Sequence, residues 1–342
     1  MRYGSGVLIS EECLNKTNMF FKIKFNNFLQ GIERKMQQAF HKKDSFLNRL
    51  FMKGLPSTNL VQAIIIKGIK KKDFLLIRFG LYEYQLCYQY LEKSVGIRKE
   101  YSNYISDHIH TDAGIVWQSM ADLDDYAKFI IENLKMVDVI AYWRNYPSKL
   151  VFNDFYKKEV KHINVEDLYP FPFWHNSLLP YWQNELKGKR VLLVTSFSDT
   201  VIKQYSQREK IWENADDILP SFNLITFQSV CTNGGQYDAR FKSWREAVLY
   251  MRDEIKKIEC DIILISCGGY GIPLSIELKK MKKTVIQWGG CYQLWFGIKG
   301  ARWENVLEIK KYFNKYWVYP SELETPPNAR KVDGSCYWKN MV

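Results

Sequence analysis

The sequence of 342 residues lacks the short motifs that reveal a function directly. It contains no Walker A motif, no GxSxG nucleophile elbow, no zinc-finger spacing, no aromatic RNP motif and no recognisable helix-turn-helix. It also has no internal repeat and no low-complexity tract. The net charge of +12 favours anionic partners such as nucleotides, phosphorylated lipids or an anionic membrane. Because no nucleic-acid motif accompanies that charge, we expect no nucleic acid among the partners.

Signals for secretion and membrane insertion are missing as well. No apolar run is long enough to cross a bilayer, and the N-terminus lacks the apolar core and small-residue cleavage site of a signal peptide. The seven cysteines are scattered, odd in number and without a Cys-x-x-Cys pair, which is typical of free thiols in a reducing compartment. We therefore expect a cytoplasmic protein. The aromatic content of 15 % suits stacking on sugars or bases, and equally suits core packing.

What is present is an alternation of strand and helix patterns. Continuous apolar runs end near Gly80 and Trp143, and four more follow within residues 187–290, separated by amphipathic helical patterns. This alternation predicts an α/β fold with a mostly parallel, Rossmann-like sheet and helices on both faces. We divide the chain into four parts: a basic helical N-terminal extension (1–60), an N-terminal part of the α/β domain that ends in a Pro- and aromatic-rich connection (61–185), a Rossmann-like nucleotide-binding part (186–320) and a C-terminal tail (321–342).

The N-terminal extension mixes phenylalanines with lysines at near-helical spacing over residues 18–43. One interpretation is an interfacial helix on anionic lipid, with Phe20, Phe21, Phe25 and Phe28 buried in the membrane. Residues 1–50 would then bring the protein to the inner face of the membrane. The other interpretation is a helix packed on its own domain with the lysines in solvent.

A glycine-rich turn follows one predicted strand, in the segment ILISCGGYGIPL. Ligands of parallel sheets bind beyond the carboxyl ends of the strands. Gly268, Gly269 and Gly271 permit close backbone approach, and the free amides of the helix start that follows attract phosphate. The spacing differs from the dinucleotide fingerprint, so it suggests a mononucleotide or diphosphate site. A tight turn without a ligand is the alternative.

A second turn, in VTSFSDT, is rich in hydroxyl groups. Ser196, Ser198 and Thr200 surround a predicted helix start, and Arg208 lies further along that helix. Hydroxyls, unpaired amides and the helix dipole together make an anion site. With the glycine-rich turn it would hold a diphosphate, whereas ordinary helix capping is the alternative.

Further charged and aromatic residues cluster in two segments. RFGLYE places Arg78 at a strand end and Glu83 in the first turn of the next element, where the glutamate would bind a metal, act as a base or simply favour the helix start. GGCYQLWFGIKGARW carries Lys299 and Arg302 among aromatics, which suits a loop that stacks on a base and neutralises phosphate, or an aromatic plug over the sheet. The pair His108 and His110 has no further clustered ligand for a metal in the sequence.

These segments resemble those of bacterial glycosyltransferases of the GT-D fold. RFGLYE (78–83) is similar to the family's early RFGDGE-type segment, LLVTSFSDT (192–200) to its strand and turn near the nucleotide, and IILISCGGYGIPL (262–274) with TVIQWGG (284–290) to its late strand and glycine turn. GIKGARW (297–303) and GSCYW (334–338) also resemble segments of uncharacterised proteins from polysaccharide-synthesis loci.

The resemblance implies a glycosyltransferase that moves a sugar from a nucleotide-diphosphate donor to a surface polysaccharide or a lipid-linked glycan. In the family a DxE motif serves a divalent metal, manganese or magnesium, and the donor diphosphate. Its glutamate falls on Glu83, but its aspartate falls on Leu81, which cannot bind a metal. Three outcomes stay open: a metal held by Glu83 with another group, metal-free catalysis in which Arg78, Lys299 and Arg302 neutralise the diphosphate, or binding without turnover. The last includes a non-catalytic scaffolding protein, and another nucleotide-dependent transferase or hydrolase is the further alternative.

Overall fold

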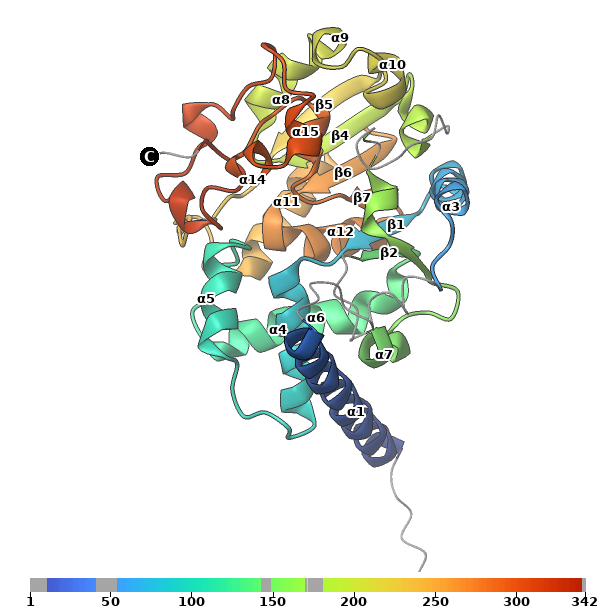
Figure 1. Ribbon diagram of the computed structural model, residues 1–342, viewed down its shortest axis with the longest axis vertical. Helices are drawn as coiled ribbons and strands as arrows, with labels where there is room; N and C mark the ends of the chain where they lie inside the picture. Colours follow the sequence, from blue (N-terminus) through green and yellow to red (C-terminus); the bar gives the residue numbers. More distant parts are fainter. Residues whose placement is uncertain (1–10, 41–53, 143–148, 170, 172–180, 340–342) are drawn as a thin grey trace, which may run out of the picture.

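The computed structural model describes residues 11–40, 54–142, 149–169, 171 and 181–339. Its centre is one seven-stranded sheet in which every paired strand is parallel to its neighbours, in the order β3-β2-β1-β7-β6-β4-β5 (Figure 1). The predicted α/β fold with a parallel, Rossmann-like sheet is therefore confirmed. The strands are β1 (Leu75–Arg78), β2 (Val139–Tyr142), β3 (Lys161–Asn164), β4 (Arg190–Thr195), β5 (Asn223–Gln228), β6 (Ile262–Ser266) and β7 (Val285–Gln287).

The composition of each strand follows its place in the sheet. β6, near the middle, consists of four apolar residues followed by Ser266, and all five are buried. β5 and β3, at the two edges, carry polar residues and are partly exposed. Strands covered on both faces need apolar side chains in both directions, and edge strands do not.

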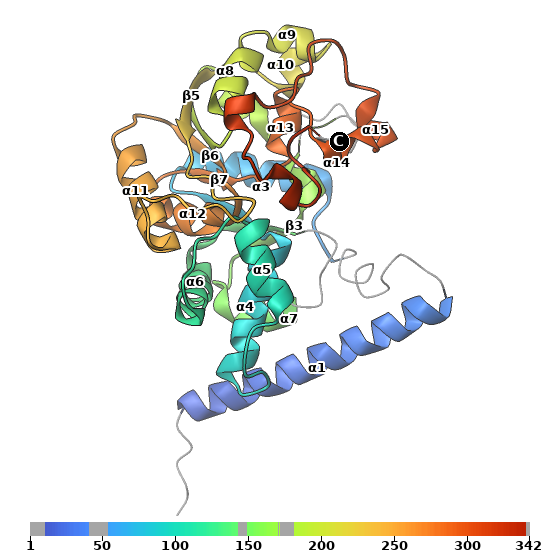
Figure 2. The ribbon, with the colours of Figure 1, turned by 90° about the vertical axis from the view of Figure 1, so that its left-hand side faces the viewer.

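Helices cover both faces of the sheet and enclose two separate cores (Figure 2). Along β4, Leu192 and Val194 belong to one core and Val191 and Leu193 to the other, as the alternation of side chains in a strand requires. The first core is covered by α4 (Leu81–Ser94), α5 (Asn103–Thr111), α6 (Met120–Asn133), α7 (Lys149–Phe152), α11 (Trp244–Lys256) and α12 (Gly271–Lys280). The second is covered by α3 (Thr58–Lys71), α8 (Ser198–Tyr205), α9 (Arg208–Ile211), α10 (Ala215–Ile218), α13 (Tyr292–Trp295), α14 (Ala301–Glu304) and α15 (Leu307–Lys310).

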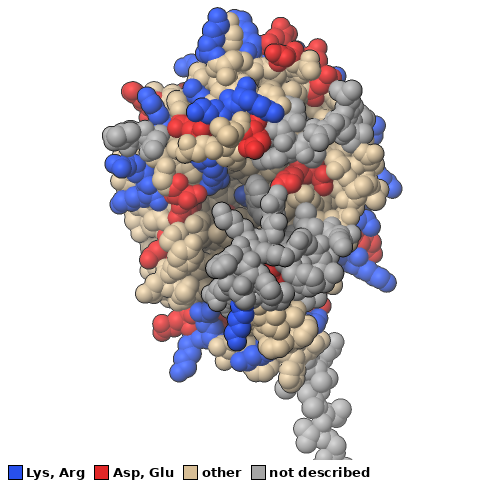
Figure 3. Space-filling model, in the orientation of Figure 1, with Lys and Arg blue, Asp and Glu red and all other residues tan. Residues whose placement is uncertain are grey.

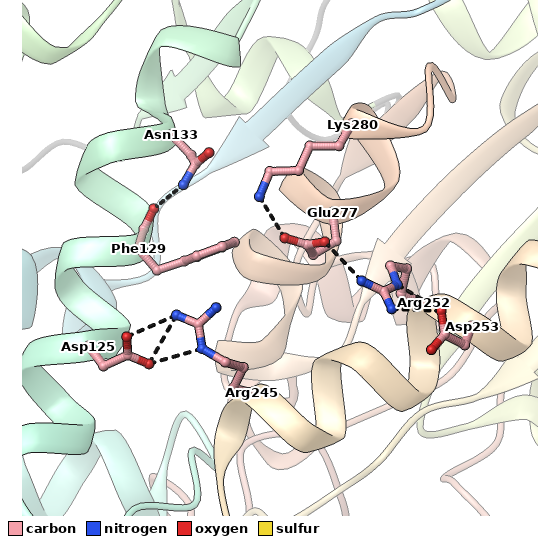
Figure 4. A network of polar contacts seen from close by, with 8 residues as sticks. All are labelled: Asp125, Phe129, Asn133, Arg245, Arg252, Asp253, Glu277 and Lys280. Atoms are coloured by element: carbon pink, nitrogen blue, oxygen red, sulfur yellow. Dashed lines mark hydrogen bonds and ion pairs between the residues drawn. The ribbon is translucent and has the colours of Figure 1, made fainter.

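Charged side chains join three helices of the first face, α6, α11 and α12 (Figure 4). Arg245 of α11 donates hydrogen bonds to Asp125 of α6, the shortest of 2.9 Å, and its guanidinium lies over the ring of Phe129. Glu277 of α12 accepts from Arg252 of α11 and from Lys280, at 3.3 and 2.7 Å. Ion pairs near the surface contribute little stability each, so this network orients helices that the apolar core holds together.

The connections after β4 and β6 run in opposite directions. α8 leads from β4 to β5 over one face, and α12 leads from β6 to β7 over the other. Where the chain leaves two neighbouring strands toward opposite faces of the sheet, a crevice opens at their carboxyl ends. Ligands bind in this crevice in open α/β sheets. β1, β2 and β3 come from residues 61–185 and the other four strands from 186–320, so both predicted parts of the α/β domain build one sheet.

Some elements differ from the sequence-based expectation. β3 lies within the segment that we interpreted as a connection, and its partly exposed, polar residues hide its strand character. The predicted helix after β4 is divided into α8 and α9 by a turn at Ser206 and Gln207. The apolar run before β1, for which we predicted no element type, is the helix α3, because its buried residues recur at helical spacing.

The N-terminal extension forms a long helix, α1 (Glu11–Phe40), which lies across one end of the molecule beside α4 and α7 (Figure 2). None of the helices in the described parts of the chain combines the length and hydropathy needed to cross a membrane.

Candidate functional site

A cavity of about 660 Å³ lies at the carboxyl edge of the sheet, a volume typical of small-molecule sites. Its walls come from the β1–α4 turn, from the ends of β2, β4, β6 and β7, and from the C-terminal segment. Aromatic side chains make up much of the lining: Tyr82, Tyr142, Phe197, Tyr292, Trp303 and Trp338. The basic residues of the surface do not single out this site, because lysines and arginines are interspersed with acidic residues over the face seen in Figure 3. The charges inside the cavity therefore decide what it attracts.

Arg78 stands at the end of β1, next to β7. Its backbone amide donates a hydrogen bond of 2.6 Å to Oε1 of Gln287. Gly289, with a φ of 78°, brings its backbone so close that a Cβ there would lie 2.8 Å from Nε of Arg78. The glycine after β7 thus makes room for the guanidinium group at the edge of the cavity.

Glu83 occupies the first turn of α4, and its carboxyl group folds back over Gly80. A Cβ on Gly80 would lie 2.6 Å from the carboxyl carbon of Glu83, so a side chain at position 80 would displace that group. Glu83 is 7 % exposed. Burial raises the pKa of Glu83, and its own backbone amide and the positive charge of Arg78 offset that rise only in part. A carboxyl group with a raised pKa is suited to accept a proton near neutral pH.

Arg302 reaches the cavity from α14. Its Nη2 donates a hydrogen bond of 2.9 Å to Oδ2 of Asp333, and its guanidinium lies 5.0 Å from the ring centroid of Tyr337. Burial raises the pKa of Tyr337 to about 12, although both Arg302 and Arg78 act to lower it. Both guanidinium groups therefore lie near Tyr337 in the cavity wall, and the carboxyl groups of Glu83, Asp112, Glu166 and Asp333 line the same cavity.

The C-terminal segment holds these groups in an uncommon backbone conformation. Asp333, Gly334 and Ser335 all have positive φ, of 44°, 63° and 65°. Non-glycine residues seldom adopt this conformation, and such strain gathers at functional sites. The turn carries Asp333 to Arg302 and Tyr337 into the cavity wall.

Among the residues predicted to bind a diphosphate, Ser196, Gly268 and Arg302 line the cavity together with Arg78 and Glu83. The others do not line it: Ser198, Thr200, Arg208, Gly269, Gly271 and Lys299.

The start of α8 is already occupied by a carboxylate of the chain itself. The amides of Asp199 and Thr200 donate to Oε1 of Glu324, at 2.8 and 3.2 Å, and the Thr200 hydroxyl donates to the same carboxylate. The hydroxyl of Ser198 lies 3.5 Å from the carbonyl oxygen of Thr195, within its own turn. The predicted anion preference of this helix start is thus met within the protein.

The glycine-rich turn serves packing as well as the cavity. A Cβ on Gly268, which has a φ of 56°, would lie 2.7 Å from the carbonyl oxygen of Ala113. The amide of Gly269 donates to that same oxygen (2.7 Å), and a Cβ on Gly271 would crowd Gln287. Gly268 faces the cavity, whereas Gly269 and Gly271 allow the segment after α5 and the end of β7 to approach.

The two remaining basic residues have other partners. Arg208 donates to the carbonyl oxygen of Leu219 (3.0 Å) and pairs with Asp216, so it fastens α9 to α10. The ammonium group of Lys299 lies 4.6 Å from the ring centroid of Tyr319.

The donor set does not fit a divalent metal. Leu81 lines the cavity and is 42 % exposed, yet it has no ligand atom, and Glu83 is turned toward Gly80. Nδ1 of His108 and Nδ1 of His110 face the backbone oxygens of Tyr104 and Ile115. In the parts of the chain that the structure describes, no three His, Cys, Asp or Glu side chains come together in a way that could hold a metal ion.

Several residues of the cavity were not predicted from the sequence, above all Asp333, Tyr337, Trp338 and Gln287. The first three lie in the tail, where no strand or helix pattern indicates what they face. The sequence pointed to the tail only through the GSCYW segment, which resembles segments of proteins from polysaccharide-synthesis loci.

Comparisons of the chain with protein-family models, with curated proteins and with solved structures returned no significant match.

Proposed function

We propose that this protein is a glycosyltransferase of GT-D type that transfers a sugar from a nucleotide-diphosphate donor to a surface polysaccharide or lipid-linked glycan. The observation that carries the proposal is the cavity at the carboxyl edge, which Arg78 and Arg302 line together with the buried Glu83. Aromatic walls suit a nucleoside base and sugar rings.

In the proposed reaction, the bond between the donor sugar and the diphosphate breaks and a bond to an acceptor hydroxyl oxygen forms. Negative charge grows on the departing diphosphate, and Arg78 and Arg302 stabilise it. Glu83 takes the proton of the acceptor hydroxyl, a role that its raised pKa favours. Because the donor set does not fit a metal, the proposal uses these side chains alone.

A second candidate is a protein that binds a sugar nucleotide without turnover, as a scaffolding subunit of a polysaccharide pathway. Leu81 favours it, since the residue lies in the cavity wall where a metal-binding aspartate was expected. Another nucleotide-dependent transferase or hydrolase would use the same two arginines.

Thermal-shift measurements with a panel of sugar nucleotides, with and without manganese, test the donor site. We expect at least one nucleotide sugar to raise the melting temperature without manganese. Arg78→Met and Arg302→Met should each weaken its binding by about 10- to 100-fold, since a hydrogen bond to a charged group is worth about 1.5–3 kcal/mol. Lys299→Met, which removes a cation near but outside the cavity, is the matched control. A folded protein that no nucleotide stabilises would sink the donor-site proposal.

Turnover separates the two candidates. Once a donor is found, Glu83→Gln should retain its binding and lower the transfer rate by about 10²–10⁴-fold, the usual contribution of a general base. Equal transfer rates for the wild type and Glu83→Gln would show that Glu83 is structural. Donor binding with no transfer to any acceptor in the wild type would favour the scaffolding protein.

A further inference from the structure

The outward side of α1 carries a row of exposed apolar side chains. Phe21, Phe25, Phe28 and Ile32 are 64 %, 57 %, 63 % and 40 % exposed. Their spacing of four, three and four residues places them along one side of the helix. We call these four residues the phenylalanine row. Adjacent exposed apolar residues of this size mark an interaction surface, because single exposed ones are common but rows are not.

The opposite side of α1 is fixed to the rest of the protein. Ile23 is fully buried in the core that includes α4. Nδ2 of Asn26 donates to the Tyr88 hydroxyl (2.8 Å), and Nδ2 of Asn27 donates to Glu92 (3.0 Å). Because α1 packs on the domain through this side, the phenylalanine row remains exposed in the described part of the protein.

The charge beside the row indicates the kind of partner. Lys24 and Lys35 are exposed and lie one helical turn from members of the row. Within residues 15–18 and 21–35, wherever the structure describes an exposed side chain of α1, none is acidic. Aromatic residues flanked by lysines on a helix that lies flat against its domain are typical of an interfacial helix on anionic lipid.

The spacing of the row would also suit a helix of a second copy of the chain, but its composition and length argue against that partner. A coiled-coil seam prefers leucine and β-branched residues, and three of these four side chains are phenylalanine. The row extends over less than two heptads, whereas a coiled coil needs about three to four.

We propose that α1 docks this protein on an anionic membrane surface, with the phenylalanine row in the interfacial layer and Lys24 and Lys35 at the lipid phosphates. This refines the expectation from the sequence. Phe20, which we expected in the membrane, is half-buried and lies outside the row, and Ile32 belongs to the row instead. The interpretation of a packed helix holds for one side of α1, and the proposal assigns the membrane interpretation to the exposed apolar side.

The helix α4 connects this surface with the cavity. Its first turn, Leu81–Tyr84, lines the cavity, and Tyr88 and Glu92 in its later turns hold α1. Four helical residues rise about 6 Å, so the packed side of α1 lies about one turn of α4 from the cavity, and the phenylalanine row lies on the far side of α1. If the proposed transferase function holds, a membrane-docked enzyme would meet a lipid-linked acceptor close to its cavity, but docking itself does not depend on that function.

Vesicle flotation of the full-length chain tests the proposal, with phosphatidylcholine vesicles that contain or lack phosphatidylglycerol. We expect binding to the anionic vesicles and little to the neutral ones. The triple variant Phe21→Gln/Phe25→Gln/Phe28→Gln should lower the partition coefficient by at least about 100-fold, since burial of each aromatic ring contributes roughly tenfold or more. Lys24→Gln/Lys35→Gln should lower it by about 10- to 30-fold, because each cation near an anionic surface contributes about fivefold.

A matched control removes three exposed apolar side chains elsewhere. Tyr237, Leu307 and Leu323 are 68 %, 75 % and 95 % exposed, and their replacement by glutamine should leave flotation unchanged. Three results would overturn the proposal: no flotation of the wild type, equal flotation of the phenylalanine variant, or a lipid-free dimer in sedimentation that this variant abolishes. None of these results bears on nucleotide binding in the thermal-shift assay, so the two proposals fail separately.

Discussion

Opposing influences act on the protonation of Glu83, the residue that tells most about the candidate site. The start of α4 and the charge of Arg78 favour its carboxylate form, whereas burial favours the protonated form, and burial prevails. Gly80 and Gly289 are required because they have no Cβ. A Cβ at position 80 would clash with Glu83, and one at position 289 would clash with Arg78. The proposed chemistry therefore depends on two glycines as much as on two charged side chains.

The raised pKa of Glu83 predicts how stability depends on pH. Between the usual glutamate pKa and the raised one, the folded protein keeps a proton that the unfolded chain has released, so stability falls as pH rises through this window. Glu83→Gln cannot titrate. We expect it to be more stable than the wild type above the window, by about 1.4 kcal/mol for each unit by which the pKa is raised. Below the window the difference should shrink toward zero.

Urea unfolding of both proteins at about pH 4 and about pH 8 measures this difference. Glu246→Gln is the matched control, because Glu246 has the same place in the first turn of α11 but is exposed. If the wild type has the larger free energy of unfolding at the higher pH, the fold stabilises the carboxylate form of Glu83 and the prediction is wrong.

At the scale of single elements, α8 shows why its start was misjudged from sequence. The start of α8 does create a place for an anion, but that anion is the side chain of Glu324, which accepts from the amides of Asp199 and Thr200 and from the Thr200 hydroxyl. A sequence does not reveal that a glutamate more than a hundred residues later will reach this helix. The same applies to Arg208, which has its partner in Asp216.

Glu324 should consequently matter for stability and not for ligand binding. Glu324→Ala removes the acceptor of three backbone amides and two hydroxyls, and we expect the free energy of unfolding to fall by about 1–3 kcal/mol. Nucleotide affinity should change less than twofold. Chemical denaturation and titration with the donor found by thermal shift measure the two effects.

The neighbouring Glu322→Ala is the control for this variant, because Glu322 is exposed and should change stability by about 0.5 kcal/mol or less. A large gain in nucleotide affinity for Glu324→Ala would instead support the start of α8 as the diphosphate site.

For the whole molecule, sequence patterns predicted the architecture well because strands such as β4 and β6 are mainly apolar runs bounded by turns. β4, β6 and the helices α11 and α12 lie where periodicity places them. β3 was missed because four residues with one buried side chain have no readable period. The tail was missed because its role depends on where it packs, at the ends of strands that lie more than thirty residues earlier in the chain.

Trp338 tests the structural role of that tail. It is 2 % exposed, packs edge-on against Phe197 and donates a hydrogen bond of 3.0 Å to the carbonyl oxygen of Glu324. Trp338→Ala should lower the free energy of unfolding by about 3–5 kcal/mol, as for other buried aromatic residues. Equilibrium unfolding in urea measures it, with Leu323→Ala, at a residue 95 % exposed, as the control. A change as small as in the control would mean that the tail only rests on the domain.

The order of the strands has a consequence for biosynthesis. β1 is the first strand of the sheet that the ribosome produces, yet one of its two neighbours is β7, the last. One edge of β1 therefore stays open while about two hundred residues are added, and open strand edges invite association with other chains. The cavity is finished later still, when Tyr337 and Trp338 arrive. A chain that is cut short before these residues carries Arg78 and Glu83 without this part of the cavity wall, so incomplete copies would have an unfinished cavity and be prone to aggregate.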